Sequence, residues 1–220
     1  MNKKITVILV DDHRMFRDGL KHLLVGEDIA DVIGEASTGK EFLNLIEQSM
    51  PDLVLMDIEM PELNGIDATK IATEKYPDLK VLALTMSSEQ VYYQNMISAG
   101  AKGFILKTSG IEELKKAIFE VSKGESYFSS ELLRQIILTM EKGQNEPKTS
   151  SYTDNLLSKR ELEVLENICV GLTTDEIAEK LFLSPKTIKG YRTNILTKTA
   201  CNNTASLVMY SIKNNLVDIR

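Results

Sequence analysis

The sequence predicts two domains: an α/β domain with a doubly wound, five-stranded parallel sheet, and after it a small all-α helix-turn-helix domain. Short apolar runs alternate with amphipathic helical patterns through the first half of the chain, and such alternation is typical of a parallel sheet covered by helices. A polar segment at residues 143–155, which contains Gly143 and Pro147, then ends the apolar periodicity. Three closely spaced helix-start signals follow this segment and predict a second, helical unit.

The strands of the first domain are expected at its short apolar runs, residues 5–10, 31–36, 53–57, 81–85 and 103–106. The helices that alternate with them are expected at residues 14–25, 39–48, 65–76, 88–99 and 111–122. This alternation predicts a flavodoxin-like strand order with helices on both faces of the sheet. A further helical pattern at residues 130–142 leads out of the domain. We therefore expect the α/β domain at 1–124, a linker helix and flexible linker at 125–155, and the helical domain at 156–220.

The composition is that of an ordinary soluble protein, with 43% hydrophobic and 26% charged residues. At 220 residues the chain exceeds the usual size of one domain. No apolar run approaches the ~18 residues of a membrane span, and the stretch after Lys4 is too short for a signal-peptide core. Cys169 and Cys201 lack metal-ligand spacing and indicate reduced thiols. We expect a cytoplasmic protein without a membrane partner.

Acidic residues stand where two of the apolar runs end. Asp11 and Asp12 follow the first run, and Asp57 ends the third. In an open α/β sheet, the carboxyl ends of the strands meet at the edge where ligands bind. Each close pair of carboxylates costs about 4 kcal/mol at an effective dielectric near 20, so either a proton or a hard cation such as Mg²⁺ is expected among them. A single Asp after a strand is more often a loop or helix-cap residue, which is the competing interpretation.

Two further strand ends carry residues that complement these acids. Thr85 ends the fourth apolar run and Lys107 follows the fifth. Carboxylates, a hydroxyl and an ammonium at one sheet edge would bind a metal ion and a phosphoryl group together. The combination therefore favours Mg²⁺-dependent phosphoryl transfer.

Residues 1–122 resemble the receiver domain of a two-component response regulator. The matching segments are Val10-Asp11-Asp12-His13, Leu55-Met56-Asp57-Ile58-Glu59-Met60-Pro61, Asn64-Gly65, Leu84-Thr85, Ala99-Gly100-Ala101 and Ile105-Leu106-Lys107. The resemblance implies that Asp57 is the phosphoacceptor, and that Mg²⁺ is bound by Asp11, Asp12, Asp57 and the backbone carbonyl of Glu59. It further implies that Lys107 and Thr85 contact the phosphoryl oxygens. Phe104 stands at the aromatic switch position, where such domains frequently have Tyr.

The helical domain begins with three capping patterns. Ser158 and Glu161 form the ends of a capping box, and Thr173 and Glu176 form those of a second. Ser184-Pro185 then provides an N-cap followed by Pro at the first helical position. A short helix, a tight turn and a longer helix make a helix-turn-helix unit, although caps alone would also suit a generic helical bundle.

The charge distribution favours DNA binding by this unit. The net charge of the chain is −6, but no acidic residue occurs from Lys180 to Val217. That stretch contains the basic residues Lys180, Lys186, Lys189, Arg192, Lys198 and Lys213. A cationic region centred on the second helix of a helix-turn-helix is the expected footprint for phosphate contact. The competing interpretation is a solvated helical face that lacks acids by chance.

Residues 156–217 resemble the LuxR-type helix-turn-helix domain, through Leu157-Ser158-Lys159-Arg160-Glu161, Val164-Leu165, Gly171-Leu172-Thr173, Glu176-Ile177-Ala178, Leu183-Ser184-Pro185-Lys186-Thr187-Ile188-Lys189 and Asn194-Ile195-Leu196. Together the two resemblances imply the NarL/FixJ class of response regulators. The recognition helix is expected at residues 185–199, with Ile188 and Ile195 inward and Lys189, Arg192 and Thr193 outward. The candidate DNA-contacting residues are Lys186, Thr187, Lys189, Gly190, Arg192, Thr193 and Lys198. By analogy with the LuxR-type family, Lys189, Gly190 and Thr193 are expected at base edges. Lys186, Arg192 and Lys198 are expected at phosphates.

The expected function is phosphorylation-dependent control of transcription. A sensor histidine kinase would phosphorylate Asp57, and the protein would then bind promoter DNA as a homodimer formed through the terminal helix near residues 204–214. The chain is expected to be no enzyme beyond its own phosphoryl transfer and dephosphorylation. Two alternatives remain: a regulator that works without phosphorylation, and an aspartyl-phosphate phosphatase. The phosphatase usually needs a second Asp two residues after the nucleophile, where this chain has Glu59.

Overall fold

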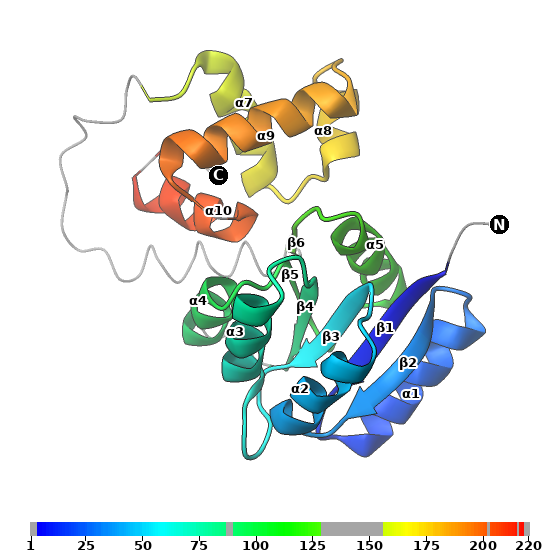
Figure 1. The fold of residues 1–220 in the computed structure, drawn as a ribbon. Coiled ribbons are helices and arrows are strands. Elements are labelled where there is room, and N and C mark those ends of the chain that lie inside the picture. Colours follow the sequence, from blue (N-terminus) through cyan, green and yellow to red (C-terminus); the bar gives the residue numbers. More distant parts are fainter. Residues whose placement is uncertain (1–3, 87–89, 129–155, 202, 215, 218–220) are drawn as a thin grey trace. The chain divides into compact units, whose positions relative to one another are not determined.

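The computed structural model divides the chain into two compact units, residues 1–126 and 127–220 (Figure 1). It describes residues 4–86, 90–128, 156–201, 203–214 and 216–217. The helix predicted at 130–142 and the linker predicted at 143–155 lie outside the described residues.

The first unit is built on strands β1 to β5 of a six-stranded sheet with the order β2-β1-β3-β4-β5-β6, whose short last strand follows the boundary between the units. The strands are β1 (Ile5–Val10), β2 (Ala30–Ala36), β3 (Leu53–Asp57), β4 (Val81–Thr85), β5 (Gly103–Leu106) and β6 (Tyr127–Phe128). Strands β1 to β5 pair in parallel, in the flavodoxin-like order that the sequence predicts. The sixth strand was not predicted, because its two residues are too few to show a strand periodicity.

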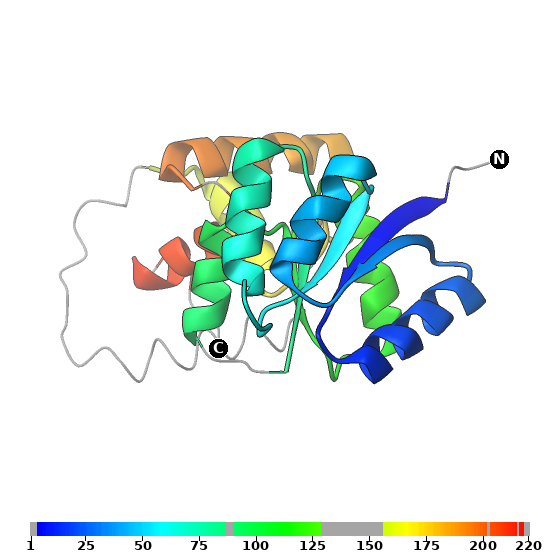
Figure 2. The same ribbon diagram turned by 60° about the horizontal axis from the view of Figure 1, so that its bottom comes forward.

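Helices cover both faces of this sheet (Figures 1 and 2). They are α1 (Arg14–Gly26), α2 (Gly39–Gln48), α3 (Gly65–Lys75), α4 (Gln90–Ser98) and α5 (Ile111–Ser122). α2, α3 and α4 pack side by side on one face, and side chains of α1 and α5 line a common pocket on the other. β3 and β4 are buried along their full lengths, since both of their faces are covered by helices.

The second unit contains four described helices. These are α7 (Lys159–Cys169), α8 (Thr174–Lys180), α9 (Pro185–Thr199) and α10 (Thr204–Lys213). Both predicted capping boxes form, and the Ser184 hydroxyl accepts the Thr187 N–H at the start of α9. α7, α8 and α10 each pack against α9, so the predicted recognition helix is also the centre of this small core. Its buried side chains include Val164, Leu165, Ile168, Ile177, Ile188, Ile195, Leu207 and Val208.

Among the described helices, none is both long enough and apolar enough to cross a membrane. Cys169 and Cys201 are free thiols, and burial raises the pKa of Cys169 to about 12. Cys169 therefore behaves as a small apolar core residue rather than as a nucleophile.

Candidate functional site

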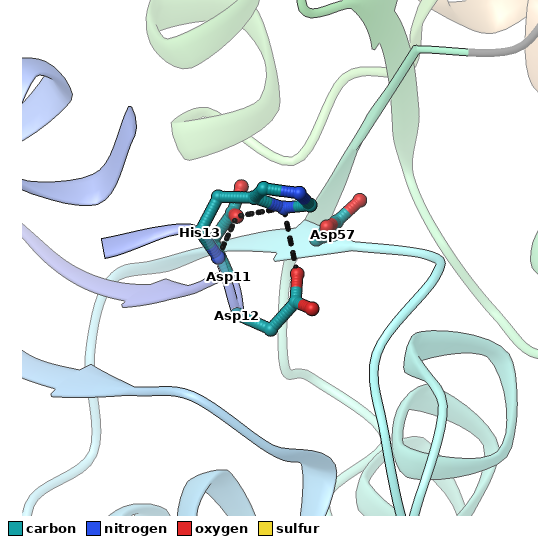
Figure 3. Close-up of side chains that lie close together, drawn as sticks. All are labelled: Asp11, Asp12, His13 and Asp57. Atoms are coloured by element: carbon teal, nitrogen blue, oxygen red, sulfur yellow. Dashed lines mark hydrogen bonds and ion pairs between the residues drawn. The ribbon is translucent and has the colours of Figure 1, made fainter. Parts of the chain in front are cut away.

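An acidic cluster lies at the carboxyl edge of the sheet (Figure 3). Asp11 and Asp12 follow β1, and Asp57 is the last residue of the adjacent β3. One potential ligand atom from each of these residues and from His13 lies within 4.8 Å of all the others. The parallel arrangement explains this proximity, because neighbouring strands that run the same way deliver their final residues to the same edge.

Lys107 supplies the positive charge of the cluster. Its Nζ lies 2.7 Å from Asp11 Oδ2 and 2.8 Å from Asp57 Oδ2. Asp11 and Asp57 are only 3% and 4% exposed, so little solvent screens these ion pairs. Three carboxylates against one ammonium leave two negative charges, which a divalent cation would neutralise.

The pKa values of the two buried groups follow from this environment. Burial raises the pKa of Asp57 above its ordinary value, against the opposing effect of the Lys107 ammonium. Burial alone would lower the pKa of Lys107, but its contacts with Asp11 and Asp57 outweigh burial and raise it. Lys107 therefore stays charged, and the ionised form of Asp57 depends on its cationic neighbours.

His13 also belongs to this cluster, although it was not predicted as a site residue. Its Nδ1 lies 2.8 Å from Asp12 Oδ1 and 3.5 Å from Asp11 Oδ1, while its side chain is 71% exposed. Its backbone N–H also donates to Asp11 Oδ1. The only sequence signal was its place directly after Asp12, at the start of α1. A His there would usually be a solvated cap residue.

The donor set fits a hard divalent cation. Asp11 Oδ2 and Asp12 Oδ1 are buried, and each has one nitrogen close to it, Lys107 Nζ for Asp11 and His13 Nδ1 for Asp12. A carboxylate oxygen has two lone pairs, so each of these atoms can accept a further ligand beside its neighbouring nitrogen. Carboxylate oxygens are the ligands that Mg²⁺ prefers.

The loop after Asp57 folds tightly back onto the strand end. The N–H of Gly65 donates to Ile58 O at 2.9 Å, and a Cβ at Gly65 would lie only 1.9 Å from the Asp57 carbonyl oxygen. Only Gly permits that approach. Asn64 caps α3 by accepting the Asp67 N–H, which begins the helix at this point. The Asn64-Gly65 pair therefore places α3 directly against the candidate phosphoacceptor.

The other residues predicted for the site surround this edge. Thr85 is the buried last residue of β4, and its carbonyl accepts the Lys107 N–H at 2.7 Å. The side chain of Glu59 accepts the Tyr92 hydroxyl at 2.8 Å, which links the β3–α3 loop to α4. Phe104 is fully buried and contacts the Tyr93 ring edge to face, with ring centroids 6.2 Å apart.

Tyr93 carries an unsatisfied hydroxyl. Its side chain is fully buried, and its Oη has no hydrogen-bond partner among the described residues. Burial raises its pKa to about 12, so the hydroxyl is neutral at ordinary pH. We expect Tyr93→Phe to raise the free energy of unfolding of the first unit by about 1 kcal/mol, because it removes a desolvated polar group without leaving a cavity. Thermal unfolding should show an increase in Tm of about 3 °C. A lower Tm would mean that the hydroxyl has a partner.

A second candidate site is the outward face of α9. Lys186, Thr187, Lys189, Gly190 and Thr193 are all exposed there. The Thr193 hydroxyl donates to the carbonyl of Lys189, and nothing lies within 4 Å of a Cβ built at Gly190. These residues remain candidates for contact with DNA.

The predicted outward orientation of Arg192 is wrong. Arg192 is 8% exposed and donates to the hydroxyls of Thr174 and Thr204, so it connects α9 to the first residues of α8 and α10. It follows Ile188 by four residues and precedes Ile195 by three, which places it in the buried stripe of the helix. Its charge suggested an outward position, but its helical spacing and the two hydroxyls decided the orientation.

Lys198 has a partner within the domain. Its Nζ lies 2.7 Å from an oxygen of Glu161, which is buried and also accepts the Ser158 N–H. The interaction joins the end of α9 to the start of α7. Lys198 would have to leave this carboxylate in order to contact a DNA phosphate.

The contribution of the Glu161 carboxylate to the stability of the second unit depends on pH. Its hydrogen bond with Lys198, followed by those with Ser158, holds the pKa of Glu161 below its ordinary value of 4.5. A lowered folded-state pKa stabilises the fold above the unfolded value and loses that stability as the pH falls through the folded value. We expect Glu161→Gln, which preserves the cap, to destabilise the second unit by about 1 kcal/mol at neutral pH. Glu161→Ala also breaks the capping box and should cost about 1 kcal/mol more.

Urea unfolding between about pH 3 and pH 7 tests this expectation. At pH values below the ordinary pKa of Glu, the free energy of unfolding of the wild type should decrease more steeply with falling pH than that of Glu161→Gln. Equal pH dependence in the two proteins would show that the ion pair contributes no stability.

Sequence comparisons agree with both units. Residues 7–119 match the response regulator receiver domain family, and residues 155–211 match the luxR family of bacterial regulatory proteins. The chain therefore belongs to the two-component response regulators that carry a LuxR-type DNA-binding domain, and it is a regulator of transcription. This confirms the resemblances found in the sequence.

Individual relatives match along nearly the full chain. It is 33% identical to the transcriptional regulatory protein DegU of Brevibacillus brevis, with 99% of this chain and 97% of the relative covered. It is 36% identical to the oxygen regulatory protein NreC of Staphylococcus aureus strain JH9, with 96% of this chain and 99% of NreC covered. Among solved structures, the response regulator ChrA of a heme-sensing two-component system has a TM-score of 0.54 at 29% identity, covering 97% of this chain and 98% of ChrA. RcsB in a complex with DNA has a TM-score of 0.57 at 25% identity, and the match covers 96% of this chain and 99% of the RcsB chain.

Proposed function

We propose that this response regulator is switched by phosphorylation of Asp57 by a sensor histidine kinase, and that the phosphorylated chain binds promoter DNA as a homodimer. The observation that carries this proposal is the ion-paired cluster of Asp11, Asp57 and Lys107 at the end of the sheet. A cluster that joins a carboxylate nucleophile to an ammonium suits transfer of an anionic group. The protein would act in the cytoplasm, where promoter DNA and the kinase domain meet.

The transfer replaces one bond to phosphorus by another. A carboxylate oxygen of Asp57 attacks the phosphorus of a phosphohistidine, so that an O–P bond forms and the N–P bond to the imidazole breaks. Lys107 lies 2.8 Å from Asp57 Oδ2 and would balance the charge of the incoming phosphoryl oxygens. The Thr85 hydroxyl, at the end of the neighbouring strand, would donate to one of these oxygens.

Asp11, Asp12, Asp57 and the backbone carbonyl of Glu59 would bind Mg²⁺. When bound, this ion neutralises charge that develops on the transferred group. The ammonium of Lys107 pairs with both Asp11 and Asp57. Turnover of an added phosphomonoester is not expected, so we propose a switch and not an enzyme.

Phosphorylation of the first unit would change DNA binding by the second unit. The phosphoryl group adds negative charge beside Lys107 and Thr85, and that change can shift the packing of the adjacent loops. The RcsB–DNA complex supports DNA binding for a chain with this domain order. We propose that α10 forms the dimer contact, so that two copies of α9 enter adjacent half-sites.

The test is to measure DNA affinity and molecular mass of the full chain with and without acetyl phosphate and Mg²⁺. We expect the phosphodonor to shift the mass toward that of a dimer and to tighten binding to a selected duplex about tenfold or more. Chelation of Mg²⁺ should remove both effects. Equal affinity and mass in all conditions would support a regulator that works without phosphorylation.

A further inference from the structure

The turn between α8 and α9 places a large apolar residue in a left-handed backbone conformation. Phe182 has φ 54°. Its N–H donates to Glu179 O, and the N–H of Leu183 donates to Ala178 O. This pair of bonds is the Schellman motif, in which the left-handed position is usually occupied by Gly because a Cβ is unfavourable there.

Other helices of the chain end with the same pair of bonds but use residues that suit them. The left-handed residues are Gly100 after α4, Gly124 after α5 and Gly171 after α7, with φ values of 101°, 86° and 89°. Two more helix ends carry the small residues Asp28 and Ala200. Phe182 is therefore the exceptional residue among these helix ends.

Packing within the domain does not explain this residue. The Phe182 side chain is 95% exposed, the largest exposure of any described large hydrophobic residue. An exposed Phe gains nothing from the hydrophobic effect, and its backbone conformation is unfavourable. Gly or Asn at this position would satisfy the same turn with less strain. Among the described residues, the Phe182 side chain therefore makes no packing contact that would favour Phe over Gly at this position.

The position of Phe182 indicates the partner. It lies two residues before Ser184, the N-cap of α9, and the chain places Lys180 and Lys186 on either side of it. No acidic residue occurs from Lys180 to Val217. An apolar side chain that has a lysine two residues before it and another four residues after it, next to the helix proposed to enter the major groove, matches the surface of DNA, where apolar sugars and thymine methyl groups lie between phosphates.

We propose that Phe182 packs against DNA at the edge of the groove entered by α9, on a deoxyribose or a thymine methyl group. This contact rests on the proposed DNA-binding function and adds an apolar contribution beside the phosphate contacts. It releases no counterion, so it strengthens binding without changing the salt dependence. Phe182 is thus a DNA-contacting residue outside the recognition helix.

The test uses the full chain, acetyl phosphate with Mg²⁺, and a duplex selected by the wild type from a random-sequence pool. Phe182→Gly and Phe182→Asn should weaken binding about tenfold, while Phe182→Tyr, which keeps the ring, should bind like the wild type. Tm of the second unit should be unchanged or higher in the Gly variant. The slope of log affinity against log salt should stay constant, whereas Lys186→Ala should reduce it by about 0.9.

Val170→Ser is the matched control, because Val170 is a half-exposed apolar residue at the end of α7 in the same domain. It should leave DNA affinity unchanged. Replacing thymines of the duplex by uracil distinguishes the two contacts. If the wild type loses DNA affinity and Phe182→Gly does not, Phe182 contacts a thymine methyl group. If the wild type loses no affinity, Phe182 contacts the sugar.

Three results would overturn the proposal. These are equal affinity of Phe182→Gly and the wild type with unchanged transcription, a lowered Tm in the Gly and Asn variants that accounts for their loss of binding, and equal affinity with reduced transcription. The third result would assign Phe182 to a protein partner such as RNA polymerase. If the wild type itself bound no duplex, the proposed function would fail as well, and this outcome is distinct from failure of the Phe182 contact alone.

Discussion

Asp57→Asn is expected to reduce phosphoryl incorporation from acetyl phosphate to background, a loss of at least about a thousandfold. The amide has nearly the shape of the carboxylate but is a poor nucleophile at phosphorus. Burial raises the pKa of Asp57, so the ionised carboxylate is unfavourable in the folded protein. In the variant, Lys107 still has its ion pair with Asp11. We therefore expect Tm to be unchanged or higher, so that loss of labelling does not reflect unfolding.

Labelling is measured by intact mass after incubation with the phosphodonor and Mg²⁺. Asp78→Asn is the matched control, because Asp78 is exposed and lies before β4, away from the carboxyl edge. This control should be labelled like the wild type. Persistent labelling of Asp57→Asn would contradict the assignment of Asp57 as phosphoacceptor.

Arg192→Ala is expected to lower the free energy of unfolding of the second unit by about 3 kcal/mol. The substitution removes a buried side chain that links three helices, and it removes the guanidinium donors from the hydroxyls of Thr174 and Thr204. A small domain has only about 5 to 15 kcal/mol of net stability, so much of the fold would be lost near physiological temperature. DNA binding should fall together with the folded fraction.

Calorimetry of the full chain separates this effect from a lost phosphate contact. Arg192→Ala should lower the unfolding transition of the second unit and leave that of the first unit unchanged. Lys186→Ala, at an exposed position of the same helix, should leave both transitions unchanged and reduce the salt slope of DNA binding by about 0.9. A normal transition together with a reduced salt slope in Arg192→Ala would instead make Arg192 a phosphate contact.

Most of the fold was predictable because its signals are local. The apolar runs of β1, β3, β4 and β5 have the predicted bounds, and so do α2, α5 and α9. Caps at Ser158, Thr173 and Ser184 begin their helices as predicted. Periodicity and capping act over a few residues, so one sequence is enough to detect them. β6 was not predicted, because a two-residue strand has no periodicity to detect.

The candidate sites were predictable only in part. The spacing of Asp11, Asp12 and Asp57 at strand ends indicated a common edge, and the structure places their side chains together. His13 and Tyr93 gave no such signal, since an imidazole or a phenol in the sequence does not reveal its neighbours. Arg192 and Lys198 were assigned by charge, whereas their partners in the structure are residues on other helices.

The sequence by itself determined the order of strands and helices, the two families, and the side chains that end the strands. These depend on local periodicity and on motifs that lie within short segments. Only the tertiary structure decided that Lys107 pairs with both Asp11 and Asp57, that Arg192 turns into the helical core, and that Phe182 stands exposed in a left-handed turn. The reason is physical: packing brings together groups that are distant in the chain, and burial and hydrogen bonding, not residue type alone, decide where a charged or apolar side chain lies.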